Sequence, residues 1–288
     1  MDTTMKQAYR VARELLRDRV RSSSPETLEI LEQVRQADVI VVEGSYDRIQ
    51  DVLEMAGMPF TAVNPERFDK SELRPDQIVF VNCPGNVSPK ALHKLEAFVR
   101  EGGFLFTTDW AVRNVLEHAF PGFVEFNDRP TTDEVVRIEL LDREDPMLKT
   151  VLDANDDPQW WLEASSYPIR VLDPQRVKVL IRSKEIEQRH GDSPVLVTFS
   201  YGEGTVYHMI SHFYLQRTET RTARHAASSM TYVAEKGVDQ AGMWKYRELG
   251  AEGLTTGQLQ SALSSNTIIL GVLLRHQTRD LRRSQPDE

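Results

Sequence analysis

Apolar runs and amphipathic stretches alternate from residue 38 onward and predict a regular series of strands and helices. Residues 39–42, 78–81 and 104–106 are apolar throughout, which is typical of strands buried on both faces of a parallel sheet. Residues 88–101 begin with Ser-Pro and place apolar residues at helical spacing, which predicts a capped helix. Because strands that alternate with helices form βαβ units, we predict an α/β fold with a flavodoxin-like (Rossmann-like), mostly parallel sheet.

The pattern changes near residue 131, where segments with strand character follow one another. The turn Gly202-Glu203-Gly204 joins the last two of them as a tight hairpin, so we expect an antiparallel extension of the sheet. Residues 155–161, rich in Asp, Asn and Trp, are predicted as a loop. The four expected strands are residues 135–141, 177–182, 195–201 and 205–212.

Helical patterns occupy both ends of the chain. Residues 221–234 and 251–274 are expected helices, and the charged residues 275–288 are expected to fray. These flanking helices offer surfaces through which copies of the chain could form a homo-oligomer. We therefore divide the chain into an N-terminal helical extension (1–37), an α/β domain (38–215) and a C-terminal helical extension with a charged tail (216–288).

Composition narrows the classes of function. Of 288 residues, 35 are basic and 44 acidic, and the resulting net charge of −9 argues against nucleic-acid binding through total charge. The single cysteine excludes an intramolecular disulfide framework and a zinc site built from several cysteines. The longest apolar run, residues 267–274, is too short to span a membrane, and residues 1–37 lack a secretory signal pattern. We expect a cytoplasmic protein without membrane contact.

Candidate chemistry lies at the carboxyl ends of the expected parallel strands, where open α/β sheets bind ligands. Small and polar residues end strands in any such fold because turns require them, so their presence alone does not identify a ligand. A pocket at this edge would suit a small polar ligand or a protein partner, and no cofactor is predicted. The candidate ligand-binding residues are Ser45, Tyr46, Asn86, Thr108, Asp109 and His212.

Two further groups of residues suggest other kinds of binding site. His208 and His212 have the even spacing that places both on one face of a strand, but a metal ion would need a third ligand such as Asp109 or Glu43, and we predict no metal site. Trp160-Trp161, with Glu163 and Ser166 nearby, could form an aromatic platform for a sugar or a partner. Such a pair also anchors loops to a core.

Two segments carry a resemblance to a known superfamily. The first, residues 78–110, reads IVFVNCPGNVSPKALHKLEAFVREGGFLFTTDW, and the second, residues 194–214, reads PVLVTFSYGEGTVYHMISHFY. The first resembles the strand, Pro-Gly loop, helix, Gly-Gly and strand order of class I glutamine amidotransferase-like proteins. The second resembles the closing strands of the ThuA-like branch. The resemblance covers residues 38–215 and implies a flavodoxin-like sheet and, in catalytic members, a Cys-His-Glu triad.

The chain departs from this resemblance where catalysis would occur. Catalytic members carry a cysteine on the sharp turn after the fourth strand, but here that position falls on Thr108 or Asp109, followed by the bulky Trp110. His212 matches the triad histidine, while Tyr214 stands where the triad carboxylate is expected. Without a thiol at the turn, glutamine hydrolysis has no nucleophile. We therefore predict a non-catalytic module for ligand sensing or protein interaction.

An enzyme remains the alternative interpretation. Cys83, the sole thiol, ends the strand next to the expected turn, and Asp109 and His212 are candidates for proton transfer or nucleophilic attack. The alternative is a hydrolase of a small or sugar-like substrate that uses Asp109 or Cys83 with His212. Pro84 removes a backbone N–H that could stabilise an oxyanion, and a lone cysteine at a strand end is commonly inert.

Overall fold

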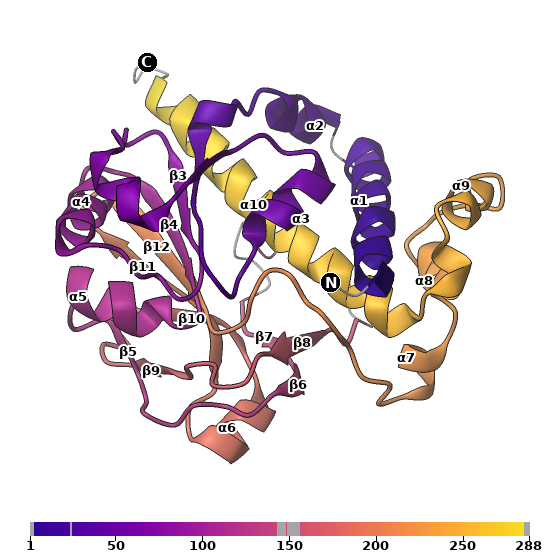
Figure 1. The fold of residues 1–288 in the computed structure, drawn as a ribbon. Coiled ribbons are helices and arrows are strands. Elements are labelled where there is room, and N and C mark those ends of the chain that lie inside the picture. Colours follow the sequence, from indigo (N-terminus) through magenta and orange to yellow (C-terminus); the bar gives the residue numbers. More distant parts are fainter. Residues whose placement is uncertain (1–2, 24, 143–147, 149–155, 285–288) are drawn as a thin grey trace.

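An eight-stranded mixed sheet forms the centre of the protein in this computed structural model (Figure 1). The structure describes residues 3–23, 25–142, 148 and 156–284. Five strands are parallel and lie in the order β2-β1-β3-β4-β12, and β11, β10 and β7 continue the sheet in antiparallel pairs. This is the flavodoxin-like order 2-1-3-4-5 with β12 as the fifth strand, and the predicted fold class is confirmed. The strands are β1 (Val39–Val42), β2 (Thr61–Val63), β3 (Ile78–Val81), β4 (Phe104–Thr108), β7 (Glu139–Leu140), β10 (Lys178–Arg182), β11 (Pro194–Tyr201) and β12 (Gly204–Met209).

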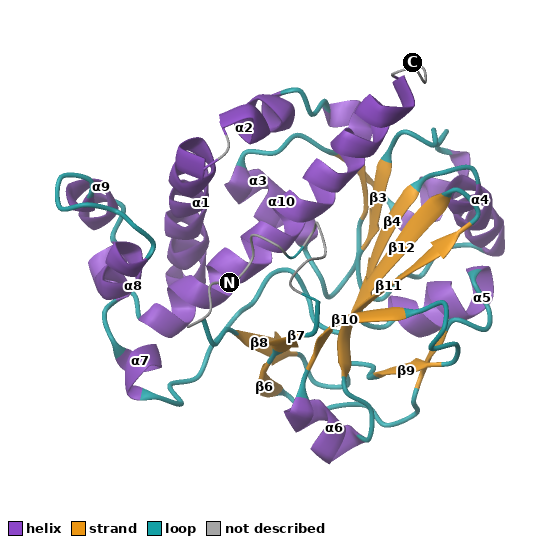
Figure 2. Ribbon diagram, turned by 180° about the vertical axis from the view of Figure 1, so that it is seen from behind, coloured by secondary structure: helices purple, strands orange, loops and turns teal. Residues whose placement is uncertain are grey.

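Helices cover both faces of this sheet (Figure 2). The helices α3 (Ile49–Ala56), α1 (Thr3–Ser23) and α10 (Thr256–Ser284) lie on one face, and α4 (Pro89–Arg100) and α5 (Glu117–Ala119) lie on the other. Because both faces are covered, every side chain of β1, β3 and β4 is buried, which explains their uninterrupted apolar sequences. The Ser88 hydroxyl accepts a hydrogen bond from the Ala91 N–H and caps α4, as its sequence predicts.

The helices at the two ends of the chain pack against each other and against the sheet. In α1, the Tyr9 hydroxyl donates to the Phe213 carbonyl at 2.6 Å, and the Asn266 amide of α10 donates to the Tyr9 carbonyl at 3.3 Å. The expected helix 251–274 is α10, which begins at Thr256 and continues to Ser284. The prediction of a frayed segment from residue 275 is therefore wrong up to Ser284, and residues 285–288 lie outside the described part of the chain. The domain boundaries at residues 37 and 215 stay a prediction.

The second half of the chain differs more from its predicted elements. The expected strand 135–141 divides into β6 and β7, because β6 leaves the main sheet to pair with β8. The expected loop 155–161 is wrong at its end, since Trp160 and Trp161 are buried within β8 and offer no exposed platform. The expected helix 221–234 breaks where Ser228 caps a new helix. These elements are β6 (Glu134–Arg137), β8 (Gln159–Leu162), α7 (Ala223–Ala226) and α8 (Ser229–Glu235).

Short elements complete the fold. A two-stranded antiparallel sheet pairs β5 with β9, and a π-helical turn over Val112–Leu116 precedes α5. None of the described helices is both long enough and apolar enough to cross a bilayer. The remaining elements are α2 (Pro25–Glu32), α6 (Lys184–His190), α9 (Met243–Glu248), β5 (Val124–Phe126), β9 (Ile169–Val171) and the 3-10 turns Gln36–Asp38, Pro65–Lys70 and Ala251–Gly253.

Candidate functional site

Asp109 occupies the sharp turn between β4 and the helical segment that follows. Its φ is +48°, a left-handed conformation that residues other than glycine adopt rarely and that aspartate tolerates better than most. The Asp109 N–H donates to the Met209 carbonyl at 2.8 Å, and the Asp109 carbonyl accepts from the Val112 N–H at 3.0 Å. Of the two residues predicted for the turn, Thr108 ends the strand and Asp109 turns the chain.

Three side chains meet at this turn and form what we call the edge cluster: Cys83, Asp109 and His212. Cys83 follows β3 by two residues and His212 follows β12 by three. The Cys83 Sγ lies 3.9 Å from Asp109 Oδ2, and His212 Nε2 lies 3.2 Å from the same oxygen. Neighbouring parallel strands end at one edge of a sheet, so the fold brings together three residues that are far apart in sequence.

Glu163 supplies a further carboxylate that the sequence interpretation assigned to the Trp160-Trp161 platform. It follows β8, and its Oε2 lies 3.4 Å from His212 Nδ1. Tyr214, the residue at the predicted triad position, instead stacks on Tyr9 with ring centroids 5.5 Å apart. The carboxylate beside the histidine therefore comes from a different segment, and no local sequence pattern marks it.

The carboxylate of Asp109 is held by donors from the loop after β8. Ser166 Oγ donates to Oδ2 at 3.0 Å, and the Tyr167 N–H donates to Oδ1 at 2.7 Å. Asp47, a fully buried residue that the sequence interpretation missed, accepts from the Phe213 N–H at 3.2 Å. Neither ring nitrogen of His212 makes an aligned hydrogen bond with any described residue, although both lie near carboxylates.

Burial and nearby charges set the protonation of the edge cluster. Burial alone would lower the pKa of His212, but Asp109, Asp47 and Glu163 outweigh it and raise the pKa to about 9. Burial raises the pKa of Asp109 against the opposing effect of His212 and its hydrogen bonds. Burial, and then the Asp109 charge, raise the pKa of the Cys83 thiol far above its ordinary value, so the thiol is protonated at neutral pH.

Aromatic rings lie next to the site, and the three side chains of the edge cluster are buried. The Trp110 ring lies 5.2 Å from both Tyr46 and Tyr167, and its indole N–H donates to the Ser165 carbonyl at 2.6 Å. Cys83, Asp109 and His212 are 1%, 2% and 3% exposed, respectively. The distances between Asp109, Cys83 and His212 are therefore those expected of an enzyme, but among the residues that the structure describes no open path leads from solvent to these side chains.

The other predicted binding residues do not converge on one ligand. Thr108 Oγ1 accepts the Cys83 N–H at 3.0 Å, and Asn86 Oδ1 accepts from the Asn114 amide at 3.2 Å on the exposed surface. Ser45 is exposed, and Tyr46 is half-exposed beside Trp110. The edge of the sheet thus presents a covered cluster with a polar rim.

His208 and His212 do not share a metal site. The strand β12 ends at Met209, so the alternation that would align the two histidines stops before His212. The His208 Nδ1 lies 2.8 Å from Thr107 Oγ1, and burial lowers the pKa of His208 to about 3. His208 is therefore a neutral core residue.

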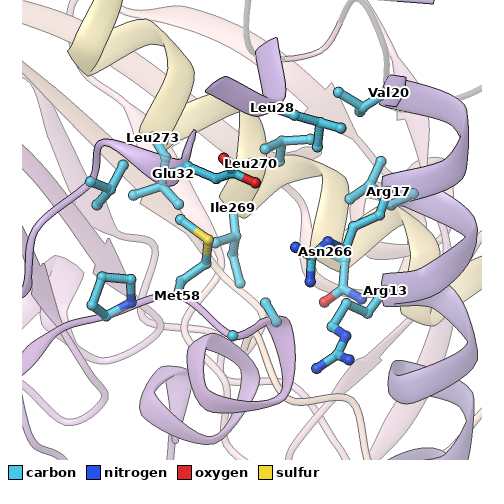
Figure 3. A pocket seen from close by; sticks show the side chains of 15 residues that line it. Arg13, Arg17, Val20, Leu28, Glu32, Met58, Asn266, Ile269, Leu270 and Leu273 are labelled. Atoms are coloured by element: carbon cyan, nitrogen blue, oxygen red, sulfur yellow. The ribbon is translucent and has the colours of Figure 1, made fainter. Parts of the chain in front are cut away.

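A separate cavity of about 240 Å³ lies among α1, α2, the end of α3 and α10, and we call it the helix cavity (Figure 3). The Asn266 Oδ1 makes no hydrogen bond within the described part of the chain, and Asn266 is only 5% exposed. Arg13 is held by the Met55 carbonyl and by Glu14. The apolar lining includes Leu16, Val20, Leu28, Ile269, Leu270 and Leu273.

No family model and no curated protein match the chain. A solved glutamine amidotransferase from Thermotoga maritima is 12% identical, with a TM-score of 0.45 and coverage of 81% of this chain and 98% of its own. A ThuA-like protein from Bacteroides uniformis is 13% identical, with a TM-score of 0.44 and coverage of 62% and 82%. A β-galactosidase from Rahnella sp. R3 is 13% identical, with a TM-score of 0.43 and coverage of 61% and 29%.

The chain spans less than a third of the length of the β-galactosidases it matches. Amidotransferases and ThuA-like proteins, the groups that the sequence resembles, are both among the matched structures. Because every one of these TM-scores is below 0.5, the fold class of this chain stands on its own strand order.

Proposed function

We propose that this chain is a non-catalytic module of amidotransferase-like fold that senses a small amphipathic carboxylic acid. The observation that carries the proposal is the helix cavity, in which a buried amide oxygen of Asn266 is left without a hydrogen bond by the described residues. Small-molecule sites are typically apolar cavities with a small number of polar groups that fix orientation. The helix cavity has this composition.

The edge cluster is a weaker candidate for the working pocket because its groups are covered. Cys83, Asp109 and His212 are each no more than 3% exposed, so a substrate could not reach them unless the surrounding side chains moved. Both carboxylate oxygens of Asp109 already accept hydrogen bonds from Ser166 and Tyr167. The cluster therefore lacks access for a substrate, and its central carboxylate is already held in place by hydrogen bonds.

Size and lining define the class of ligand for the helix cavity. An engineered cavity of ~150 Å³ holds benzene, so a cavity of about 240 Å³ has room for a larger apolar body. Arg17 lies at the cavity, is exposed and forms no ion pair with a described residue, so it can pair with a carboxylate. A ligand hydroxyl can donate to Asn266 Oδ1, and pairing a buried acceptor is worth about 1–3 kcal/mol. The class is an aliphatic or aromatic hydroxy acid.

Sensing follows from the origin of the cavity walls. The lining combines Leu16 and Val20 of α1 with Ile269 and Leu273 of α10, so a bound ligand contacts both ends of the chain. Filling the cavity would change how these helices pack, and a protein partner or a second copy that docks on the helices would detect the change.

Thermal-shift and calorimetric titrations test this proposal with three probes: 3-phenyllactate, 3-phenylpropanoate without the hydroxyl, and 2-phenylethanol without the carboxylate. We expect 3-phenyllactate to bind best and to stabilise the protein by about 2.7 kcal/mol at a hundredfold excess over its Kd. The variant Arg17→Ala should weaken binding of both acids, whereas Arg10→Ala, an exposed arginine on the same helix outside the lining, should not.

The cavity itself is tested by Ile269→Trp, which fills it. This variant should abolish binding while it keeps a cooperative melting transition. Binding that is unchanged in both Arg17→Ala and Ile269→Trp would place the ligand elsewhere and overturn the proposal, as would the absence of binding by all three probes.

A hydrolase is the second candidate. It is favoured by the positive φ of Asp109 together with the spatial order of the side chains, in which His212 lies next to Asp109 and Glu163 lies next to His212. An aspartate nucleophile that attacks the carbonyl carbon of an ester would expel the alcohol and form a mixed anhydride, which water then cleaves to the acid and the free carboxylate. Hydrolysis of p-nitrophenyl acetate that is lost in Asp109→Asn but retained in Asp128→Asn would support this candidate. Asp128 is a matched control because it is an exposed aspartate that also has positive φ.

A further inference from the structure

The edge cluster combines three different kinds of metal-binding atom: a cysteine sulfur, a carboxylate oxygen and an imidazole nitrogen. We propose that Cys83, Asp109 and His212 bind a divalent transition-metal ion, and that zinc is the ion their chemistry favours. Zinc accepts sulfur, nitrogen and oxygen ligands together, whereas magnesium and calcium prefer oxygen alone. This site is independent of the helix cavity.

The distances suit a single ion. In a tetrahedral zinc site with bonds of about 2.0–2.3 Å, neighbouring nitrogen and oxygen ligands lie about 3.3 Å apart, and sulfur and oxygen ligands about 3.6 Å apart. The His212 Nε2 to Asp109 Oδ2 distance is 3.2 Å, and the Cys83 Sγ to Asp109 Oδ2 distance is 3.9 Å. One atom from each of the three side chains lies within 4.8 Å of the others, so shifts of a few tenths of an ångström to about 1 Å complete the geometry.

His212 is oriented as a metal ligand. Its two ring nitrogens are buried and lack an aligned hydrogen bond from any residue the structure describes. With Nε2 on the ion, Nδ1–H faces Glu163 Oε2 at 3.4 Å. A carboxylate behind a ligating histidine is a recurring arrangement that fixes the ring and raises its basicity.

Asp109 is supported in the same way. Hydrogen bonds from Ser166 and from the Tyr167 backbone hold its carboxylate, and the backbone at positive φ fixes its direction. Ligating carboxylates are themselves hydrogen-bonded in metal sites. When zinc binds, the Cys83 S–H bond breaks, an S–Zn bond forms and the thiol proton passes to solvent, as does any proton on His212 Nε2. The thiolate and the Asp109 carboxylate then balance the two charges of the ion.

The first experiment is metal loading of the full chain. Because the cluster is closed to solvent, the protein is refolded from urea with either zinc or EDTA, desalted and measured for metal content. We expect one zinc ion per chain after refolding with zinc and a higher melting temperature than after refolding with EDTA. Less than about one-tenth of an equivalent of zinc, in protein that has regained its native circular dichroism, would overturn the proposal.

Cobalt refolded in place of zinc identifies the ligands. Cys83 is the only cysteine in the chain, so a thiolate-to-cobalt charge-transfer band reports this site alone. The band should disappear in Cys83→Ser and persist in His190→Gln, whose histidine pairs with Glu134 elsewhere. A cobalt complex that lacks this band in the unmodified protein would also overturn the proposal.

Affinity measurements test the role of Glu163 as a positioning residue. In competition with a chromophoric chelator, Glu163→Gln should weaken zinc binding by about 10–100-fold and leave the cobalt band present at saturation. The control Glu125→Gln, which breaks a surface pair with Arg170, should leave affinity unchanged. If His212→Gln bound zinc as tightly as the unmodified protein, the assignment of the site would be wrong.

Discussion

We predict that His208 makes the protein less stable at acidic pH, and that the variant His208→Asn loses this part of the pH dependence. His208 lies in β12, is fully buried and contacts Thr107 Oγ1 at 2.8 Å. Burial lowers its pKa to about 3 in the folded protein, whereas an unfolded histidine titrates near pH 6.5. Between these values only the unfolded chain binds the proton.

The magnitude follows from this difference. Where the unfolded state holds one more proton than the folded state, the free energy of unfolding falls by about 1.4 kcal/mol for each pH unit of acidification. Full integration from pH 7.5 to 4.5 gives a loss of about 2.5 kcal/mol from His208 alone. The loss begins as the pH falls through 6.5 and ends near pH 3, where the folded state is protonated as well.

Urea unfolding of both proteins at pH 7.5, 6.5, 5.5 and 4.5 provides the assay. His208→Asn keeps a side-chain nitrogen near Thr107 but removes the titration, so its cost should be largest at pH 7.5 and shrink by about 2.5 kcal/mol at pH 4.5. All other titrating groups are common to both proteins and cancel in the difference. A difference between the two proteins that is the same at every pH would refute the reasoning.

Two further predictions concern the stability of the fold, one at a buried ion pair and one at a close backbone contact. Lys236 and Asp156 form a 2.6 Å ion pair, and their side chains are 2% and 1% exposed. Lys236→Met leaves a buried carboxylate without this partner and should lower the free energy of unfolding by about 3–5 kcal/mol in urea titrations. The double variant Lys236→Met with Asp156→Leu should recover part of this loss. A Cβ on Gly44 would lie 2.1 Å from the Cys83 carbonyl oxygen, so Gly44→Ala should lower the free energy of unfolding by about 1–3 kcal/mol, measured in thermal melts. The control Gly253→Ala, whose Cβ meets nothing within 4 Å, should lower it by less than about 0.5 kcal/mol. Equal losses in the two variants would contradict the close contact at Gly44.

The parallel half of the sheet could be predicted because burial on both faces leaves a mark in the sequence. The strands β1, β3 and β4 read as unbroken apolar runs, and Ser88 and Gly57 mark a helix start and a helix end in the sequence. The strands of the antiparallel half have a less distinct hydrophobic pattern. Residues 135–141 look continuous, yet the chain changes partner between β6 and β7, and the choice of partner depends on residues far away in sequence.

The candidate site shows the same division. Cys83, Asp109 and His212 could be placed together because parallel strands end at a common edge. Glu163 and Ser166 could not, since they reach the cluster through a loop after β8, and β8 was not predicted as a strand. The helix cavity could not be predicted from the sequence either, because α1 and α10, which line it, come from opposite ends of the chain.

The charges and protons at the edge cluster determine what the proposed cation would replace. Each carboxylate has compensation of its own: Asp47 accepts backbone N–H groups, Asp109 is held by Ser166 and Tyr167, and Glu163 is 36% exposed on its side chain and reaches solvent. His212 and the Cys83 thiol both face Asp109 Oδ2, at 3.2 and 3.9 Å, and both carry a proton at neutral pH because their pKa values are raised. Metal ligands must be deprotonated, so a divalent ion at the proposed site would displace both protons, and the freed nitrogen lone pair and thiolate would face the ion. The proposed ion would thus replace two protons beside Asp109, with ligand movements of no more than about 1 Å.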